Sequence, residues 1–489
     1  MDYVETSGGK WELVIGLEIH AQIISNSKLF SSAPTRFGAA PNENVSFVDA
    51  ALPGVLPVIN SFCVDQAIKT GLGLNGCINL VSSFDRKNYF YPDLPQGYQI
   101  SQYKHPLVSG GYVEIEKADG SRRKINLERI HMEQDAGKSI HDQSATKSFI
   151  DLNRAGVGLM EIVTKPDMRS AEETSVFLRK LRSILRYLGA CDGNMEEGSM
   201  RADLNISLRR PGGELGIRAE IKNVNSIKFL AAAVAFETAR QIEILESGGK
   251  VDQETRLFDS ATGETRPMRS KEDAQDYRYF PEPDLPPLVL DPARVEAIRR
   301  TIPELPDAKA ERLRRDYDLS HYDAAVIASE KEIADYYEES LKHANADDKD
   351  MAKTLSNWLL GDLFALLNKH GKSIVDSHIS PKNLAELISL IKTDVISGKM
   401  AKDVLEIMWE NRRRPADVVE EKGWRQITSS DEIEAVLRKV LEEHMDKVAE
   451  YRGGKEKLFG FFIGQAMQKT QGKANPATLN EILRKLLNE

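Results

Sequence analysis

Four segments of the chain alternate between apolar and polar side chains with a period of two. Along residues 13–23, leucine, isoleucine or alanine occupies every second position, while Glu18 and His20 share the opposite face. The other three segments with this pattern span residues 125–139, 200–208 and 217–222. Such alternation is typical of antiparallel strands that bury one face of a sheet and leave the other face in water.

The polar faces of these predicted strands carry mainly imidazole, carboxylate and cationic groups. Besides Glu18 and His20 they include His131, Glu133, Asp135, Arg201, Asp203, Glu220 and Lys222. If the strands are neighbours, acids and imidazoles converge on one patch. Hard cations such as Mg²⁺ take oxygen ligands, with an occasional imidazole, and usually act together with substrate phosphates. Periodicity alone leaves a simpler interpretation open, a solvated sheet face crossed by ion pairs.

Helical patterns lie between these strands. Ser-Ala-Glu-Glu at residues 170–173 is a capping box and predicts a helix that ends near Leu188, and a second helix is predicted from about Ser226 to Glu246. The G-x-G-x-x-G match at residues 71–76 follows a helical pattern, which favours a helix C-cap and turn over a dinucleotide-binding loop. Residues 1–294 are therefore predicted to form an α+β domain, an antiparallel sheet with helices on one face.

From about residue 295 the composition shifts to helix formers. Heptad-like stripes predict an all-α helical domain over residues 295–411 and a small all-α tail domain over residues 412–489. The tail has predicted helices at residues 431–451 and 476–488, joined by a Gly-rich stretch. Its lysines could approach phosphates, namely Lys455, Lys457, Lys469 and Lys473. Solvated helix ends and loops are the other interpretation of this stretch.

Composition and charge narrow the class of protein. A length of 489 residues, with 41% hydrophobic and 29% charged residues, predicts a soluble protein of two or three domains. No apolar run approaches the ~20 residues of a membrane span, and the short, acidic N-terminus resembles neither a signal nor a transit peptide. The net charge of −9 argues against nucleic-acid binding by the whole surface, although a local basic patch remains compatible with it. Three distant cysteines without metal-ligand spacing predict reduced thiols and a cytoplasmic location.

Longer motifs carry a family resemblance over essentially the whole chain. They are Gly16–His20, Pro53–Asn60, Asp85–Pro95, His131–Lys138, Asp151–Gly156, Glu197–Asn205, Glu220–Ser226 and Asp276–Asp284. With these motifs, in this order, the chain resembles the B subunits of tRNA-dependent aspartyl/glutamyl amidotransferases (the GatB family), and its tail is similar to the YqeY family.

The resemblance implies an ATP-dependent, two-step reaction on a misacylated tRNA, carried out by a heterotrimer. The side-chain carboxylate of Glu-tRNA(Gln) or Asp-tRNA(Asn) is phosphorylated by ATP. Ammonia that the amidase (the A subunit) makes from glutamine then displaces the phosphate to give the amide, while a small C subunit belts the other two together. The N-terminal cradle domain would hold the kinase-like site, and the tail domain would recognise the body of the tRNA.

The resemblance also implies roles for particular residues. The first set expected around Mg²⁺ is His20, Glu133 and Glu161, and the second set, for another divalent ion, is Glu18, Asp203 and Glu220. The cations expected to neutralise ATP or the acyl phosphate are Arg201, Lys222 and Lys138. Lys87 and Tyr89 are assigned to cofactor binding, where the ammonia channel reaches the site. No Walker motif occurs, so a divalent ion is expected to do the charge neutralisation that a P-loop does elsewhere.

One departure from the family pattern concerns zinc. Many members have cysteines in the segments aligned with residues 31–33 and 46–50, where this chain has none. Without thiolates, no structural zinc is expected, and the loop has to be held by packing instead.

Two rival functions remain open from the residues themselves. One is a non-catalytic tRNA-binding scaffold in which the acidic cleft is only structural, and the other is a metal-dependent hydrolase of phosphoesters. ATP consumption that requires an aminoacylated tRNA would separate all three functions, because a scaffold consumes none and a hydrolase does not need the aminoacyl group.

Overall fold

The computed structural model describes residues 3–268, 276–344, 348–427 and 429–488. The chain forms two compact units, Met1–Leu305 and Pro306–Glu489. The first unit combines a large sheet with helices, and the second is helical. This agrees with the predicted α+β fold followed by all-α parts, while the finer division at residues 294 and 411 stays a prediction.

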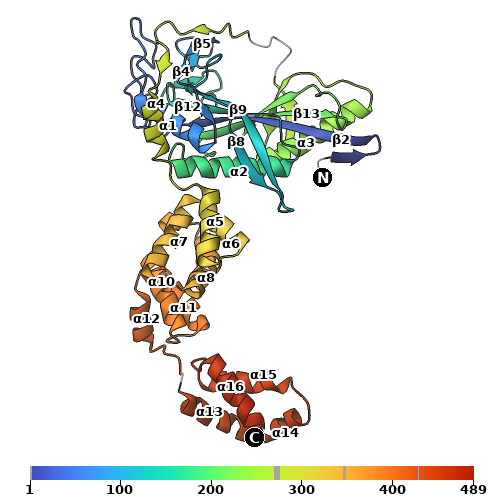
Figure 1. The fold of residues 1–489 in the computed structure, drawn as a ribbon, viewed down its shortest axis with the longest axis vertical. Helices are drawn as coiled ribbons and strands as arrows, with labels where there is room; N and C mark the ends of the chain where they lie inside the picture. Colours follow the sequence, from blue (N-terminus) through green and yellow to red (C-terminus); the bar gives the residue numbers. More distant parts are fainter. Residues whose placement is uncertain (1–2, 269–275, 345–347, 428, 489) are drawn as a thin grey trace. The chain divides into compact units, whose positions relative to one another are not determined.

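An 11-stranded sheet forms the centre of the described part of the first unit (Figure 1). Its strands are β1 (Tyr3–Thr6), β2 (Gly9–Gln22), β3 (Cys77–Ile78), β7 (Val108–Ser109), β8 (Tyr112–Glu116), β9 (Arg122–Gln134), β12 (Gly158–Thr164), β13 (Met200–Arg209), β14 (Ala219–Val224), β15 (Thr255–Asp259) and β16 (Glu264–Pro267). The order is β16-β15-β14-β13-β2-β12-β9-β7-β3, with β1 on β2 and β8 on β9. Pairing is antiparallel except between β14 and β15.

Helices cover the apolar face of this sheet. They are α1 (Ser61–Gly73), α2 (Ala171–Leu188) and α3 (Ile227–Glu246), and α4 (Pro292–Arg299) packs against α1. The apolar positions of β2 and β9 pack with side chains of α1, α2 and α3 into one core, and Figure 1 shows α2 and α3 on the same side of the sheet. The opposite face of the sheet is therefore free to carry polar side chains.

Two local predictions about helix ends are confirmed. The Ser170 hydroxyl accepts a hydrogen bond from the backbone N–H of Glu173, so α2 begins at the predicted cap. The Glu173 carboxylate in turn accepts the backbone N–H of Arg169, at 2.8 Å. Gly71 and Gly73 lie in the last turn of α1, whose C-cap is Leu74, so the glycine motif is a helix end and not a dinucleotide loop.

Three small sheets border the large one. The first has the order β17-β5-β6, the second pairs β10 with β11, and the third pairs β18 with β4. Their bounds are β4 (Val81–Ser82), β5 (Asp85–Asn88), β6 (Tyr98–Ser101), β10 (Lys138–Ile140), β11 (Phe149–Asp151), β17 (Phe280–Pro281) and β18 (Leu288–Val289). In this sheet β17 pairs with β5 and β5 pairs with β6, so residues 280–281 lie beside residues 85–101 although the two segments are far apart in the chain. Lys87, one of the predicted cofactor residues, lies on β5.

The second unit is built from helices. They are α5 (Pro306–Tyr317), α6 (His321–Ser329), α7 (Lys331–His343), α8 (Lys349–Trp358), a π-helical turn (Leu359–Leu363), α9 (Phe364–Lys369), a 3₁₀ turn (Ile374–Asp376), α10 (Pro381–Lys392), α11 (Gly398–Asn411), α12 (Pro415–Lys422), α13 (Ser430–Glu443), α14 (Met445–Arg452), α15 (Leu458–Lys469) and α16 (Pro476–Asn488). A separate core joins α13, α14, α15 and α16.

The prediction of one helix over residues 431–451 is wrong. The chain leaves helical geometry at His444, with φ −131° and ψ 40°, and α14 starts after this break. The break lets the His444 ring contact Phe461 edge-on at 5.1 Å, and lets Tyr451 lie against Phe459. Contacts with α15 therefore determine the structure at this point, although the sequence pattern is that of one continuous helix.

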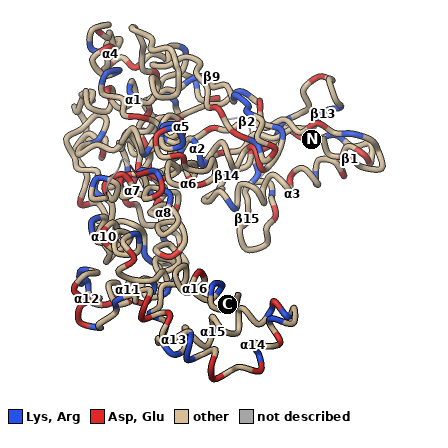
Figure 2. The backbone as a smooth tube through the Cα atoms, turned by 60° about the horizontal axis from the view of Figure 1, so that its bottom comes forward, with Lys and Arg blue, Asp and Glu red and all other residues tan. Residues whose placement is uncertain are grey.

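Charged residues of both signs are interspersed along both units (Figure 2). This pattern fits the modest net charge of −9. Among the described residues, no helix combines the length and the apolar character needed to cross a membrane.

Candidate active site

Register on the polar face of the large sheet sets four functional side chains in one row. Glu161 on β12 is the direct cross-strand partner of His131 on β9 and of His20 on β2. His20 is in turn the partner of Arg201 on β13. Paired positions on one face of a sheet lie about 5 Å apart, so the pairing alone gathers two imidazoles, a carboxylate and a guanidinium.

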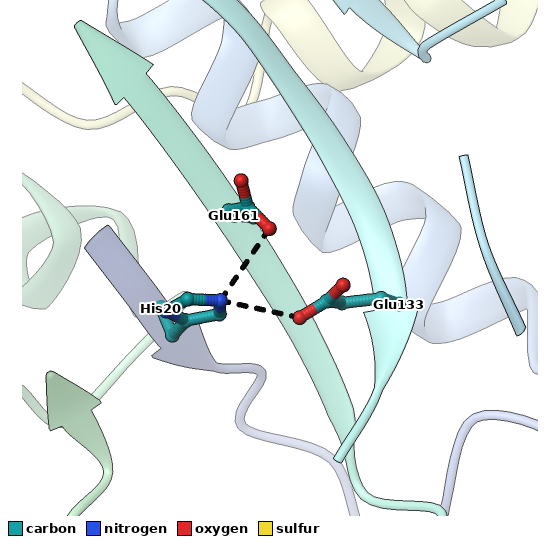
Figure 3. A group of neighbouring side chains, drawn as sticks. All are labelled: His20, Glu133 and Glu161. Carbon is teal, nitrogen blue, oxygen red and sulfur yellow. Dashed lines mark ion pairs between the residues drawn. The ribbon is translucent and has the colours of Figure 1, made fainter. Parts of the chain in front are cut away.

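Glu133 completes a compact cluster with this row. Nε2 of His20 lies 3.3 Å from Oε1 of Glu133 and 3.4 Å from Oε2 of Glu161 (Figure 3). Nε2 of His131 lies 3.3 Å from Oε2 of Glu161. One ligand atom from each of His20, Glu133 and Glu161 falls within 4.8 Å of the other two, which is a spacing that one metal ion can bridge.

The two carboxylates control the charge of the two imidazoles. Burial opposes protonation of both rings, but hydrogen bonds and negative charge from Glu133 and Glu161 outweigh it. They raise the pKa of His20 to about 10 and that of His131 to about 9. Burial also works against ionised carboxylates, yet the two imidazoles hold the pKa of Glu133 and of Glu161 below the ordinary value. The cluster is thus an ion-paired group in which a divalent cation could take the place of the imidazolium charge.

The donor set fits a hard divalent ion. Two carboxylates supply the oxygen ligands that Mg²⁺ prefers, and His20 adds an imidazole nitrogen. Nδ1 of His131 is buried and has no hydrogen-bond partner among the described residues. The neighbourhood of the cluster therefore still has a polar group that a ligand or an ordered water could satisfy.

Arg201 is held beside the cluster by Asp135. Nη2 of Arg201 donates to both carboxylate oxygens of Asp135, at 2.9 Å each. Gln22 donates to the same carboxylate at 3.1 Å, and Nε of Arg154 lies 3.5 Å from it. Sequence reasoning assigned no role to Gln22 or Arg154. The only signal was that Arg154 lies inside the motif at residues 151–156.

The second predicted set lies next to the first on the same face. Asp203 is the cross-strand partner of Glu18, and Nζ of Lys222 lies 3.0 Å from Asp203 and 2.9 Å from Glu220. Burial and the charges of Glu161 and Glu220 raise the pKa of Glu18. Lys222 therefore already neutralises two of the three carboxylates. In the described part of the chain, only the first set brings three ligand atoms within bridging distance.

Of the remaining predicted cofactor residues, Lys87 lies near the cluster and Lys138 lies outside it. Lys87 on β5 is half-buried. Its burial disfavours the ammonium form, but the nearby Glu133, Tyr279 and Glu161 side chains hold its pKa above the ordinary value. The Tyr89 hydroxyl donates to Oε1 of Gln99 at 3.1 Å. Lys138 begins β10 in the separate two-stranded sheet and is exposed, so the structure does not bring it into the cluster.

Three of the four tail lysines bind other residues of the tail. Lys455 pairs with Glu450 at 3.0 Å, and Lys469 pairs with Glu443. Lys473 donates to the Gly423 carbonyl at 3.3 Å. Lys457 directly precedes α15, and no ion pair of its side chain occurs among the residues that the structure describes.

The segment expected to lack zinc has a buried ammonium at its centre. Nζ of Lys28 donates to the Asn44 carbonyl at 2.6 Å, to Oδ2 of Asp49 at 3.0 Å and to the Leu152 carbonyl at 3.3 Å. Asp49 also accepts the Ser31 hydroxyl, at 3.0 Å. One cation thus ties the loop around residues 31–50 to the segment that carries Arg154.

Comparison with known proteins identifies the family. The GatB/GatE catalytic domain matches residues 13–296, and the GatB domain matches residues 335–487. Three bacterial relatives are named as the B subunit of aspartyl/glutamyl-tRNA(Asn/Gln) amidotransferase. The relative from Granulibacter bethesdensis is 58% identical over 484 residues, which cover 99% of each chain. The relative from Gluconobacter oxydans is 57% identical over 484 residues, again 99% of each chain. The relative from Acidiphilium cryptum is 58% identical over 490 residues, which cover 100% of this chain and 99% of the relative. The chain therefore belongs to the family of aspartyl/glutamyl-tRNA(Asn/Gln) amidotransferase B subunits.

Proposed function

We propose that this chain carries out the ATP-dependent transamidation of misacylated Glu-tRNA(Gln) or Asp-tRNA(Asn). It would phosphorylate the side-chain carboxylate of the aminoacyl group and amidate it with ammonia delivered by the amidase of the complex. The observation that carries this proposal is the cluster of His20, Glu133 and Glu161 beside Arg201, in a chain of this family. A heterotrimer with the amidase and a small third protein, a cytoplasmic location and the absence of structural zinc belong to the same proposal.

The phosphorylation step brings two anions together, so its catalysis is mainly charge neutralisation and positioning. His20, Glu133 and Glu161 would hold Mg²⁺, which neutralises phosphate charge when bound. Arg201, fixed by Asp135, presents a guanidinium that can donate to phosphoryl oxygens. Lys222 is held between Asp203 and Glu220 on the same face and adds a second cation.

The amidation step needs ammonia to reach the activated carbonyl without competition from water. We place this entry at Lys87 and Tyr89. Lys87 is half-buried next to Glu133, and Tyr89 is fixed through Gln99 to the end of β9. Restricted access of water at such an entry would limit hydrolysis of the acyl phosphate.

The test uses the assembled heterotrimer. Glu-tRNA(Gln), ATP, Mg²⁺ and ammonium chloride are supplied, since ammonium bypasses the glutaminase step. Glu133→Gln and His20→Ala are each expected to lower formation of both ADP and Gln-tRNA(Gln) by at least about 100-fold. Glu128→Gln is the matched control, because Glu128 is an exposed carboxylate on the same strand.

The outcomes separate the three functions. If both products vanish while glutaminase activity and tRNA binding survive, the cluster is the kinase site. Amidation near the wild-type rate in both variants would make the chain a binding scaffold with a structural cluster. ADP formation that continues with uncharged tRNA would instead identify a phosphate-ester hydrolase.

A further inference from the structure

Five tyrosines in the segments that flank strands β5, β6 and β17 form an unbroken row. In order of contact this tyrosine row is Tyr91, Tyr89, Tyr277, Tyr279 and Tyr103. The first three ring pairs meet edge to face, with centroids 5.9, 6.0 and 6.1 Å apart. Tyr279 and Tyr103 stack in parallel, with centroids 4.3 Å apart and 9° between the ring planes. Two segments that are far apart in the chain thus build one aromatic surface.

The backbone that carries these rings is firmly fixed. Nδ2 of Asn88 donates to the carbonyls of Tyr277 and Arg278, at 3.0 and 2.8 Å. Arg86 binds the Glu282 carboxylate through two hydrogen bonds of 2.7 and 2.9 Å. The row is therefore preorganised, and a ligand that stacked on it would not have to order the surface first.

Strand β6 connects the tyrosine row to the acidic cluster. Its residue Ser101 donates to Oε2 of Glu133 at 3.2 Å. Its residue Gln99 accepts the Tyr89 hydroxyl at 3.1 Å and donates to the Gln134 carbonyl at 2.7 Å. Nζ of Lys87 lies 4.8 Å from the ring centroid of Tyr277. A ligand on the row would thus lie beside both a cation and the candidate catalytic carboxylates.

The row is open to solvent at both ends. Tyr103 is 50% exposed and Tyr91 is 56% exposed, while the adjacent Phe90 is 86% exposed. A single exposed ring is common on protein surfaces, whereas a contiguous exposed aromatic surface marks a binding site more often. Exposed aromatic faces beside a cation are the arrangement on which single-stranded nucleic acids and nucleotides stack their bases.

We propose that the tyrosine row stacks on an adenine base and thereby orients an adenosine-bearing substrate toward the acidic cluster. This inference rests on the proposed function, in which two ligands carry adenine. One is ATP, and the other is the terminal adenosine at the 3′ end of the aminoacyl-tRNA. Both present the same planar base, so the experiment has to distinguish them.

The test compares Tyr103→Leu with Tyr103→Phe in the assembled complex, again with ammonium as the nitrogen donor. Leucine removes the aromatic face, while phenylalanine keeps it and removes only the hydroxyl. Tyr103→Leu is expected to raise one KM roughly 10-fold, with kcat within about twofold of wild type, and Tyr103→Phe is expected to behave as wild type. Tyr322→Leu, at a 73% exposed tyrosine of the second unit, is the control.

The KM that changes identifies the ligand. A rise confined to ATP assigns the row to its adenine, and a rise confined to Glu-tRNA(Gln) assigns the row to the 3′-terminal adenosine. If neither KM rises in Tyr103→Leu and in Tyr91→Leu at the other end, the inference is overturned, as it is if Tyr103→Phe loses as much as Tyr103→Leu. The proposed function fails separately, through amidation near the wild-type rate in both Glu133→Gln and His20→Ala.

Discussion

At the scale of single residues, Lys28 shows how one cation can organise a loop. Its side chain is fully buried, and the Asp49 side chain next to it is almost fully buried. Burial lowers the pKa of Lys28, and the Asp49 charge opposes that shift. Because burying a charge is costly without a partner, each of these two groups makes the other tolerable. The loop was expected to be held by packing, and in the structure this buried ion pair is a main part of what holds it.

We expect Lys28→Met to lower the free energy of unfolding by about 3–5 kcal/mol, since it leaves the Asp49 carboxylate buried without its cation. Urea unfolding followed by circular dichroism measures this loss. The double variant Lys28→Met/Asp49→Leu should recover part of it, because both charges are then gone. Lys104→Met, at an exposed lysine, is the control. A harmless Lys28→Met would show that the ion pair contributes little.

The individual site residues were predictable to different degrees. Alternation correctly placed Glu18, His20 and Glu133 on the polar faces of their strands, but the prediction that this face is in water is wrong for Glu133, which is only 2% exposed, and Glu18 and His20 are only partly exposed. Glu161 was invisible to that pattern, because its neighbours Leu159 and Val163 on the same face are apolar and β12 is largely buried on both sides. Only the family resemblance pointed to it. Cross-strand register is a long-range property, so the row from His131 to Arg201 could not be derived from local periodicity.

At the scale of elements, Glu12 joins three parts of the first unit. It lies on β2 and accepts from Nε of Arg209, at the end of β13, and from Nε of Arg169, just before α2, at 2.7 Å each. The hydrogen bond from Arg209 is the largest influence that lowers the pKa of Glu12, to about 2. A carboxyl with a depressed pKa stabilises the fold above its unfolded pKa, near 4.5, and loses that contribution as the pH falls toward 2.

Glu12→Gln is therefore expected to lower the free energy of unfolding by about 1.5–3 kcal/mol at pH 7. The difference from wild type should shrink as the pH falls from 4.5 toward 2, because wild type then loses the same ion pairs. Urea titrations across this pH range provide the measurement. Glu5→Gln removes an exposed carboxylate paired with Lys10 and should change nothing. A difference that stayed constant with pH would contradict the ionic explanation.

Elements with strong local signals were the ones the sequence predicted well. The helix that ends at Leu188 was predicted from the capping box at residues 170–173, and the structure has both the cap at Ser170 and the end at Leu188, with Gly189 as the left-handed C-cap. Helix α15 lacked such signals, since Gly460 and Gly464 weaken its helical propensity. It forms because Phe462 and Ala466 are buried in the core of the tail. Such helices are stabilised by tertiary packing, which a short stretch of sequence does not reveal.

At the scale of the whole molecule, a chain of net charge −9 has to bind a polyanion if it acts on tRNA. Figure 2 shows Lys and Arg interspersed with Asp and Glu along the described part of the chain, without a long run of basic residues. Binding therefore has to rely on local cations, among which the tail lysines are the proposed contacts. Lys455 and Lys469 would exchange Glu450 and Glu443 for phosphates, so their net contribution is smaller than that of a free ammonium. Lys457, which has no such partner among the residues that the structure describes, should contribute most.

Lys457→Ala is accordingly expected to weaken tRNA binding by the assembled complex and to reduce the slope of log K against log salt by about 1, the value for one lost phosphate contact. Lys469→Ala should reduce the slope less, since the ammonium it removes already pairs with Glu443. The measurement is equilibrium binding of labelled tRNA at several salt concentrations. Lys485→Ala removes a lysine from the last turn of α16 in the same tail and is the matched control. If Lys457→Ala, Lys485→Ala and wild type all have the same slope, Lys457 does not contact tRNA. If Lys457→Ala and Lys485→Ala reduce the slope equally, the tail attracts tRNA only through its overall charge.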